Sequence, residues 1–160
     1  MRLVLLIVIT LAITFVQLKA LTLDQVRIAQ QSYAIGAPYN LGHSLAAIAL
    51  VESQLGIYQI NAKSADYGIH QVHIKSHLAH IDIKDTQLNR SKYATKLITD
   101  SIYCANAALR ELLYWKVTRK RSNYIRYISS YNQGSRITNY DYVRKVSAAI
   151  RQLRTARIIP

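Results

Sequence analysis

Apolar side chains recur at intervals of three and four residues through most of the chain, which is the spacing of one face of an α-helix. Several of these segments begin at residues that commonly cap helices, namely Thr22, Asp100 or Ser101, and Ser122. The second segment is followed by Gly56, a residue suited to end a helix. The pattern predicts helices over residues 22–35, 44–55, 101–115, 122–132 and 138–154.

A different pattern follows the second predicted helix, between Ile57 and Ile74. The stretch YGIHQVHI, residues 67–74, alternates between apolar and polar side chains, which is typical of a β-strand. We therefore expect a mainly α chain with a small β or loop excursion after the second helix. The 160 residues contain no repeat and no linker rich in proline or glycine, which indicates one domain.

Glu52 lies on the apolar face of the second predicted helix, together with Leu45, Ile48 and Leu55. It is one of only two glutamates in the chain. Burial disfavours the charged form of a carboxylate, and a carboxylic acid with a raised pKa is suited to general acid catalysis near neutral pH. Glu52 is therefore a candidate catalytic acid. The alternative is a structural glutamate at the edge of the apolar face, in contact with water or a basic side chain.

The first twenty residues form a segment of another kind. Arg2 precedes an uncharged run, Leu3–Val16, and Ala20 is small enough for a cleavage position. We expect residues 1–20 to be a cleaved signal peptide or an uncleaved N-terminal anchor, and residues 21–160 to be the functional domain. A hydrophobic helix buried in the domain is the remaining alternative. The first two interpretations predict export, to the periplasm or outside the cell, with transient membrane contact through the N-terminus.

The chain is strongly basic, with a formal net charge of +13. Such a charge favours an anionic partner, which would be nucleic acid, a membrane surface or an acidic wall polymer. Residues 115–127, WKVTRKRSNYIRY, interleave cations with aromatic rings, as surfaces that bind nucleic acid do. Because the N-terminal segment predicts export, we expect a wall polymer or membrane as partner and no nucleic acid.

Cysteine and histidine offer two further chemistries. Cys104 is the single cysteine, so no intramolecular disulfide can form, and its apolar helical context is typical of a small buried side chain. His70, His73, His77 and His80 are spaced by three and four residues, as imidazoles are in some helical zinc sites. The strand-like alternation and the lack of acidic or cysteine ligands arranged with them favour solvent-facing histidines instead.

Four short motifs follow one another along the chain. They are ES at residues 52–53, GIHQ at 68–71, SSYNQG at 129–134 and YVRKV at 142–146. In this order they resemble the lysozyme-like lytic transglycosylases, whose motifs are Glu-Ser, Gly-Leu-Met-Gln, Ala-Tyr-Asn-Ala-Gly and Tyr-Val-x-x-Val. The stretch DYGI, residues 66–69, is also similar to c-type lysozymes. The resemblance implies a lysozyme-like α+β fold with the β excursion after the catalytic helix.

The resemblance also implies a reaction, cleavage of the β-1,4 bond between N-acetylmuramic acid and N-acetylglucosamine in peptidoglycan. Glu52 would protonate the glycosidic oxygen and then act as base toward the C6 hydroxyl, which leaves a 1,6-anhydro end. The residues carried over as substrate contacts are Gln71, Tyr131, Asn132, Ser64 and Tyr142. This chemistry needs only a carboxylic acid, so we expect no cofactor and no metal, and a monomer that acts on glycan strands.

Asp66 leaves the type of reaction open. It occupies the place of the lysozyme aspartate, so it is the candidate second carboxylate of a muramidase that hydrolyses the same bond. A similar aspartate precedes the glycine in specialised transglycosylases of secretion systems, where it would support the loop. A third alternative is a non-catalytic cationic protein that binds the wall and does not need Glu52. A phage, secretion-system or housekeeping setting would fit the sequence, and the small size, with no added wall-binding module, favours a specialised or phage role over a housekeeping one.

Overall fold

The computed structural model describes residues 21–119 and 123–160, which contain seven α-helices, a short 3-10 helix and a three-stranded antiparallel sheet. The helices are α2 (Leu23–Gly36), η1 (Ala37–Tyr39), α3 (Gly42–Ser53), α4 (Ile74–His80), α5 (Gln87–Thr99), α6 (Ser101–Thr118), α7 (Tyr124–Gln133) and α8 (Asp141–Thr155). The strands are β1 (Ile60–Asn61), β2 (Asp66–Tyr67) and β3 (Val72–His73). The predicted organisation, mainly α with a small β excursion after the second helix, is confirmed.

α3 is the centre of the hydrophobic core. It packs against α2, α6 and α8, and all five residues from Leu45 to Ala49 are completely buried. A helix enclosed in this way is apolar on nearly every side, so the apolar surface of α3 is wider than the single predicted face. Glu52 lies one turn after Ile48, near the end of α3, and it is half-buried.

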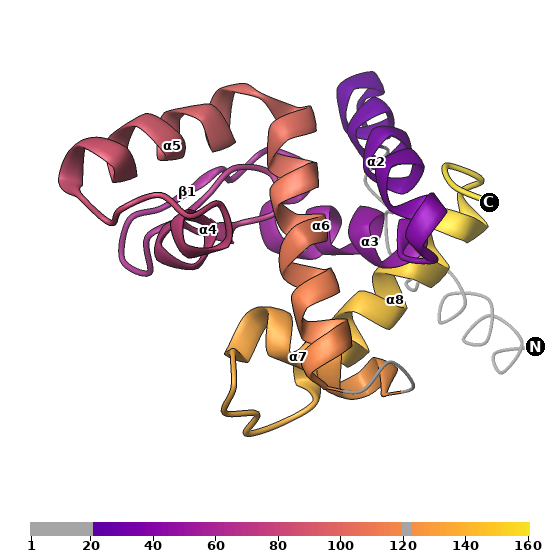
Figure 1. Cartoon of the computed structure of the whole chain (residues 1–160). Coiled ribbons are helices and arrows are strands. Elements are labelled where there is room, and N and C mark those ends of the chain that lie inside the picture. Colours follow the sequence, from indigo (N-terminus) through magenta and orange to yellow (C-terminus); the bar gives the residue numbers. More distant parts are fainter. Residues whose placement is uncertain (1–20, 120–122) are drawn as a thin grey trace, which may run out of the picture.

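Figure 1 shows α6 running through the middle of the molecule between two groups of elements. α4, α5 and the sheet lie on one side of α6, and α2, α8 and the C-terminal end lie on the other. α7 follows at the end of α6 and packs against both α6 and α8. This packing brings the third and fourth motifs, on α7 and α8, toward the end of α3.

Side-chain caps observed in the structure explain two of the predicted helix starts. The Thr22 hydroxyl accepts a hydrogen bond from the Gln25 backbone N–H, and the Gln25 side chain accepts one in return from Thr22 N–H. Asp100 caps α6 by accepting from the Tyr103 N–H, at 2.9 Å. The predicted cap Ser122 and the predicted signal peptide or anchor at residues 1–20 lie outside the described residues. The cap observed for α7 is Asn123.

Several predicted helix boundaries were wrong. α3 begins at Gly42 instead of Ser44, and α6 continues to Thr118 instead of ending near Trp115. α3 ends at Ser53 and not at Leu55, because Gln54 and Leu55 adopt left-handed backbone angles, with φ of 52° and 57°. α8 begins at Asp141 and not near residue 138. The Gln133 side chain binds the backbone of the preceding loop, where it accepts from Thr138 N–H and donates to the Asn139 carbonyl.

The prediction of one continuous strand from the alternation in residues 67–74 was also wrong. β2 ends at Tyr67, a turn of four residues follows, and β3 contains only Val72 and His73. α4 and α5 were not predicted at all. None of the helices in the two described ranges is both long enough and apolar enough to cross a membrane.

Candidate active site

Glu52 lies where two cavities of about 390 Å³ and 410 Å³ adjoin. Both cavities are lined by Glu52 and by Asn132, an exposed residue of α7. The first extends toward the sheet and α6, and the second extends along the loop before α8. Together they form a cleft, and Glu52 contacts the space on both sides of it.

Burial determines the protonation of Glu52. Loss of hydration, with a smaller contribution from the negative charge of Asp66, raises the pKa of the Glu52 carboxyl from 4.5 to about 7. A hydrogen bond from Tyr142 and the positive charge of Lys145 lower this pKa, but they offset only part of the increase. Near neutral pH the carboxyl is therefore present in both its acidic and its basic form, as a group that first donates and then accepts a proton requires.

Two parallel tyrosine rings lie beside Glu52. The Tyr142 hydroxyl donates to Glu52 Oε1 at 2.6 Å, and its ring stacks on that of Tyr131 at an angle of 13°. The Tyr131 hydroxyl donates to the backbone carbonyl of His70 at 2.8 Å. Burial raises the pKa of both tyrosines well above the ordinary value, so both hydroxyls remain donors. Tyr142 thus contacts the carboxylate directly, while Tyr131 fixes α7 to the GIHQ turn.

Ser53, the residue after Glu52, joins α3 to the same turn. Its buried hydroxyl donates to the Ile69 carbonyl at 2.6 Å and accepts from the Gly56 N–H at 2.8 Å. A side chain larger than serine would not fit between the end of α3 and the turn, because Ser53 is completely buried. The Glu-Ser pair therefore combines a group that faces the cleft with a group that holds the cleft wall.

The GIHQ turn has a conformation that few residues can adopt. Gly68 has φ of 79°, and a Cβ at this position would lie 2.3 Å from the Leu97 carbonyl oxygen. Gln71 has φ of 48°, and its side-chain nitrogen donates to the carbonyls of Gly68 and Tyr58 at 3.0 and 3.2 Å. Gln71 lines the first cavity, but its N–H donors stabilise the turn, which leaves only the amide oxygen to accept a hydrogen bond from a ligand.

Asp66 and Ser64 line the first cavity from β2 and the turn before it, whereas the two tyrosines come from α7 and α8. The exposed Ser64 hydroxyl donates to Asp66 Oδ2 at 2.5 Å. Asp66 is half-buried, and its charge affects the Glu52 carboxyl. The structure thus brings all seven predicted site residues to the cleft, including Ser64 and Tyr142.

The prediction of solvent-facing histidines was wrong for two of the four. His70 is completely buried, with Ser32 Oγ at 3.3 Å and Cys104 Sγ at 3.7 Å, and burial lowers its pKa to about 3. His77 is also buried, and its Nε2 lies 2.7 Å from the Tyr103 hydroxyl. Burial also lowers the pKa of His77, to about 4, so both imidazoles are neutral near pH 7 and hold core elements together.

The other two histidines lie nearer the surface. His73 caps α4, since its Nδ1 accepts from the Ser76 N–H, and it lines the first cavity. His80 Nε2 lies 2.8 Å from Glu111 Oε2. Within residues 21–119 and 123–160, no three side chains of His, Cys, Asp or Glu are grouped so that they could hold a metal ion.

Glu111 and Trp115 of α6 are among the residues that line the cleft and that sequence reasoning did not assign to the site. The Trp115 indole N–H donates to Glu111 Oε1 at 2.6 Å, so the Glu111 carboxylate is held between Trp115 and His80. The spacing of four residues between Glu111 and Trp115 places them on one helix face. That spacing was the available signal, but nothing in it indicated a cavity.

Comparisons of the chain with protein-family models, with curated proteins and with solved structures found no match.

Proposed function

We propose that this protein is an exported, lysozyme-like lytic transglycosylase, which cleaves the MurNAc-β-1,4-GlcNAc bond of cell-wall peptidoglycan with Glu52 as acid and then base. The observation that carries the proposal is the environment of Glu52. A half-buried carboxyl with a pKa of about 7 contacts two adjoining cavities and accepts a hydrogen bond from a buried tyrosine. These are the properties that a general acid–base needs near neutral pH.

Convergence of the four motifs supports the same proposal. Tyr142 donates to Glu52 across 90 residues of sequence, Ser53 donates to Ile69, and Tyr131 donates to His70. Each motif of the family resemblance is thus bonded to another motif at the cleft. A chance likeness of four short peptides gives no reason for such contacts, whereas a shared active site does.

In the proposed reaction, the protonated Glu52 gives its proton to the glycosidic oxygen as the bond to the anomeric carbon breaks. Positive charge develops on the sugar ring, and the Glu52 carboxylate formed in this step keeps its hydrogen bond from Tyr142. The carboxylate then takes the proton of the C6 hydroxyl on the same sugar, and O6 bonds to the anomeric carbon. The 1,6-anhydro ring forms without water, and Glu52 is again protonated.

Mass spectrometry of the products tests the proposal. Digestion of purified peptidoglycan should release muropeptides with 1,6-anhydro ends, which are one water lighter than hydrolysis products. The Glu52→Gln variant should release neither anhydro nor hydrolysed muropeptides. Digestion in H₂¹⁸O should leave these ends unlabelled. Reducing ends that carry ¹⁸O would instead support the second candidate, a muramidase.

The muramidase alternative is favoured by one observation, the position of Asp66 in the same cavity as Glu52. A second carboxylate is what hydrolysis with a nucleophile or an activated water requires. We place transglycosylation first because Asp66 already accepts a short hydrogen bond from Ser64 and its own strand has only two residues, which suits support of the turn. A wall-binding protein without activity is the third alternative, and an inactive wild type would favour it.

A further inference from the structure

A third cavity, larger than either part of the cleft at about 780 Å³, lies away from Glu52 at the C-terminal end of α8. We call it the arginine pocket, and its lining residues are Ile150, Arg151, Arg154, Thr155, Arg157, Ile158, Ile159 and Pro160. The tail that completes it is fixed in place, because Ile159 is buried and the His43 side chain hydrogen-bonds the Pro160 carbonyl at 2.9 Å. The pocket is therefore a defined surface of the fold.

The three arginines of the pocket are exposed and carry charge that the described structure does not balance. Within residues 21–119 and 123–160, no ion pair or side-chain hydrogen bond joins Arg151, Arg154 or Arg157 to another residue. Arg27, Arg90 and Arg144 differ, since each is paired with an aspartate. Three like charges within seven residues repel one another, and an anion bound against them would offset that repulsion.

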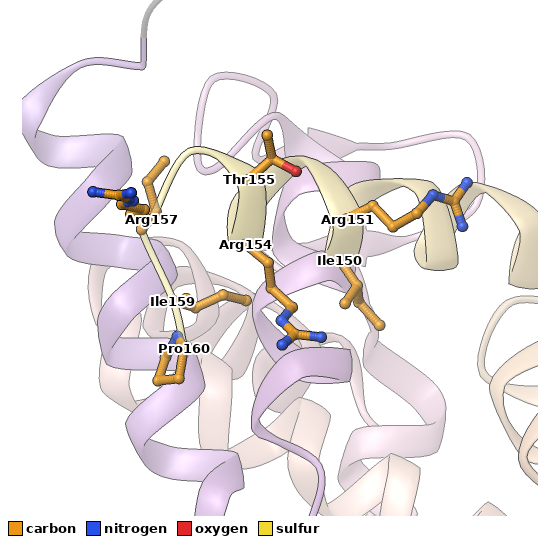
Figure 2. A pocket seen from close by; sticks show the side chains of 8 residues that line it. Ile150, Arg151, Arg154, Thr155, Arg157, Ile159 and Pro160 are labelled. Carbon is orange, nitrogen blue, oxygen red and sulfur yellow. The ribbon is translucent and has the colours of Figure 1, made fainter.

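Figure 2 shows how the three guanidinium groups are arranged. Arg151 and Arg157 extend in opposite directions, and Arg154 lies between them on the adjacent turn of α8. Groups that spread in this way do not enclose one small anion, but they can each contact a different phosphate on a broad surface. The half-buried side chains of Ile150 and Ile158 lie among the same charges.

From this combination we propose that the arginine pocket docks the protein on the phosphate headgroups of an anionic phospholipid membrane. Arginines that flank apolar side chains fit the boundary between headgroups and acyl chains, which a hydrated wall polymer does not offer. The C-terminal end also lies beside α2, the first described helix, which directly follows the apolar segment of residues 1–20. This docking is independent of the chemistry at Glu52.

Flotation with lipid vesicles tests the proposal on the full chain. The variant Arg151→Gln/Arg154→Gln/Arg157→Gln is compared with Lys75→Gln/Lys84→Gln/Lys92→Gln, which removes the same charge from exposed positions in or beside α4 and α5. In Figure 1 these two helices lie at the opposite side of the molecule from the C-terminal end. Both variants keep residues 1–20, so any binding by that segment is common to all samples.

The vesicles contain 30–40% phosphatidylglycerol. Each basic residue near such a surface contributes roughly 1 kcal/mol, so the loss of all three arginines should weaken partition by about 100-fold. The lysine variant should partition within a few fold of wild type, and phosphatidylcholine vesicles should not distinguish the three proteins. Equal weakening of both variants, or of neither, would overturn the pocket as the docking surface. So would arginine-dependent binding to inorganic phosphate or purified peptidoglycan without arginine-dependent binding to vesicles.

The vesicle assay does not depend on the proposed enzymatic activity. An inactive wild type that still requires the arginines for flotation would reject the transglycosylase proposal and keep the docking proposal. An active wild type that binds vesicles without the arginines would do the reverse.

Discussion

Glu52 and Asp66 line the same cavity, yet their carboxylates are held by different parts of the molecule. Glu52 projects from the end of the central buried helix and accepts a hydrogen bond from a tyrosine that is 6% exposed. Asp66 projects from a two-residue strand and accepts its bond from an exposed serine. The two carboxyl groups of one cleft therefore differ in what holds them, a buried tyrosine of α8 for Glu52 and an exposed serine of the neighbouring turn for Asp66.

Among substitutions around these two carboxyl groups, Glu52→Gln should have the largest effect on wall cleavage. The amide keeps the shape and can still accept the Tyr142 hydrogen bond, but it has no proton to give. Because one residue serves both proton transfers, we expect wall cleavage to fall by at least roughly 10²–10⁴-fold. Release of soluble muropeptides measures the loss, and folding is checked by circular dichroism. Full activity in this variant would reject the catalytic assignment.

The same substitution should stabilise the fold at alkaline pH. Because the folded-state pKa is about 7 instead of 4.5, the unfolded chain ionises first as pH rises, and stability is lost between these two values. Above pH 7 the cost is about 3 kcal/mol, at 1.36 kcal/mol for each unit of pKa. Urea unfolding should therefore show Glu52→Gln more stable than wild type at pH 8 and nearly equal at pH 4. An equal difference at both values would show that the charge of Glu52 is not responsible.

Tyr142→Phe should have a smaller effect, with a signature in the pH profile. The Tyr142 hydrogen bond lowers the Glu52 pKa, so its removal should raise that pKa further and move the alkaline loss of activity to higher pH. Loss of one hydrogen bond to the carboxylate should reduce the maximal rate roughly tenfold. Tyr131→Phe is the matched control. It removes the neighbouring hydroxyl, which donates to the His70 carbonyl and not to Glu52, so the alkaline loss of activity should not move to higher pH.

Asp66→Asn should have the smallest effect and shift the profile in the opposite direction. The Asp66 charge raises the Glu52 pKa, so the neutral amide should lower it and move the alkaline loss of activity to lower pH. We expect less than about a tenfold fall in rate, since one hydrogen bond to Ser64 is weakened. A loss as large as that of Glu52→Gln would make Asp66 the second catalytic carboxylate, and the reaction a hydrolysis.

The sequence predicted those helices whose buried faces and caps agree. The helix that begins after Thr22 and the helix that begins after Asp100 combine an observed side-chain cap with regularly spaced buried residues. α5 was missed because only Ala94 and Leu97 among its residues are buried, which gives no apolar periodicity. α4 was missed because it has only seven residues and its N-cap is a histidine, His73, which is not a usual start signal.

The candidate site was predictable in its residues but not in its geometry. Alternating polarity in residues 67–74 resembled a strand, although left-handed angles at Gly68 and Gln71 make a turn there. The apolar pattern also placed Glu52 on a helix without indicating which buried group would bind it, because Tyr142 is 90 residues away. Contacts of this range depend on the packing of α3 against α8, which no local pattern contains.

α8 connects the cleft and the arginine pocket as one continuous helix. Tyr142 in its first turn contacts Glu52, and Arg154 in its last turn lines the arginine pocket. Twelve residues at 1.5 Å each separate them by about 18 Å along the helix axis. A molecule docked through the pocket therefore has a fixed and short reach. If both proposals hold, it would cut only the glycan strands nearest the bilayer, whatever their concentration elsewhere.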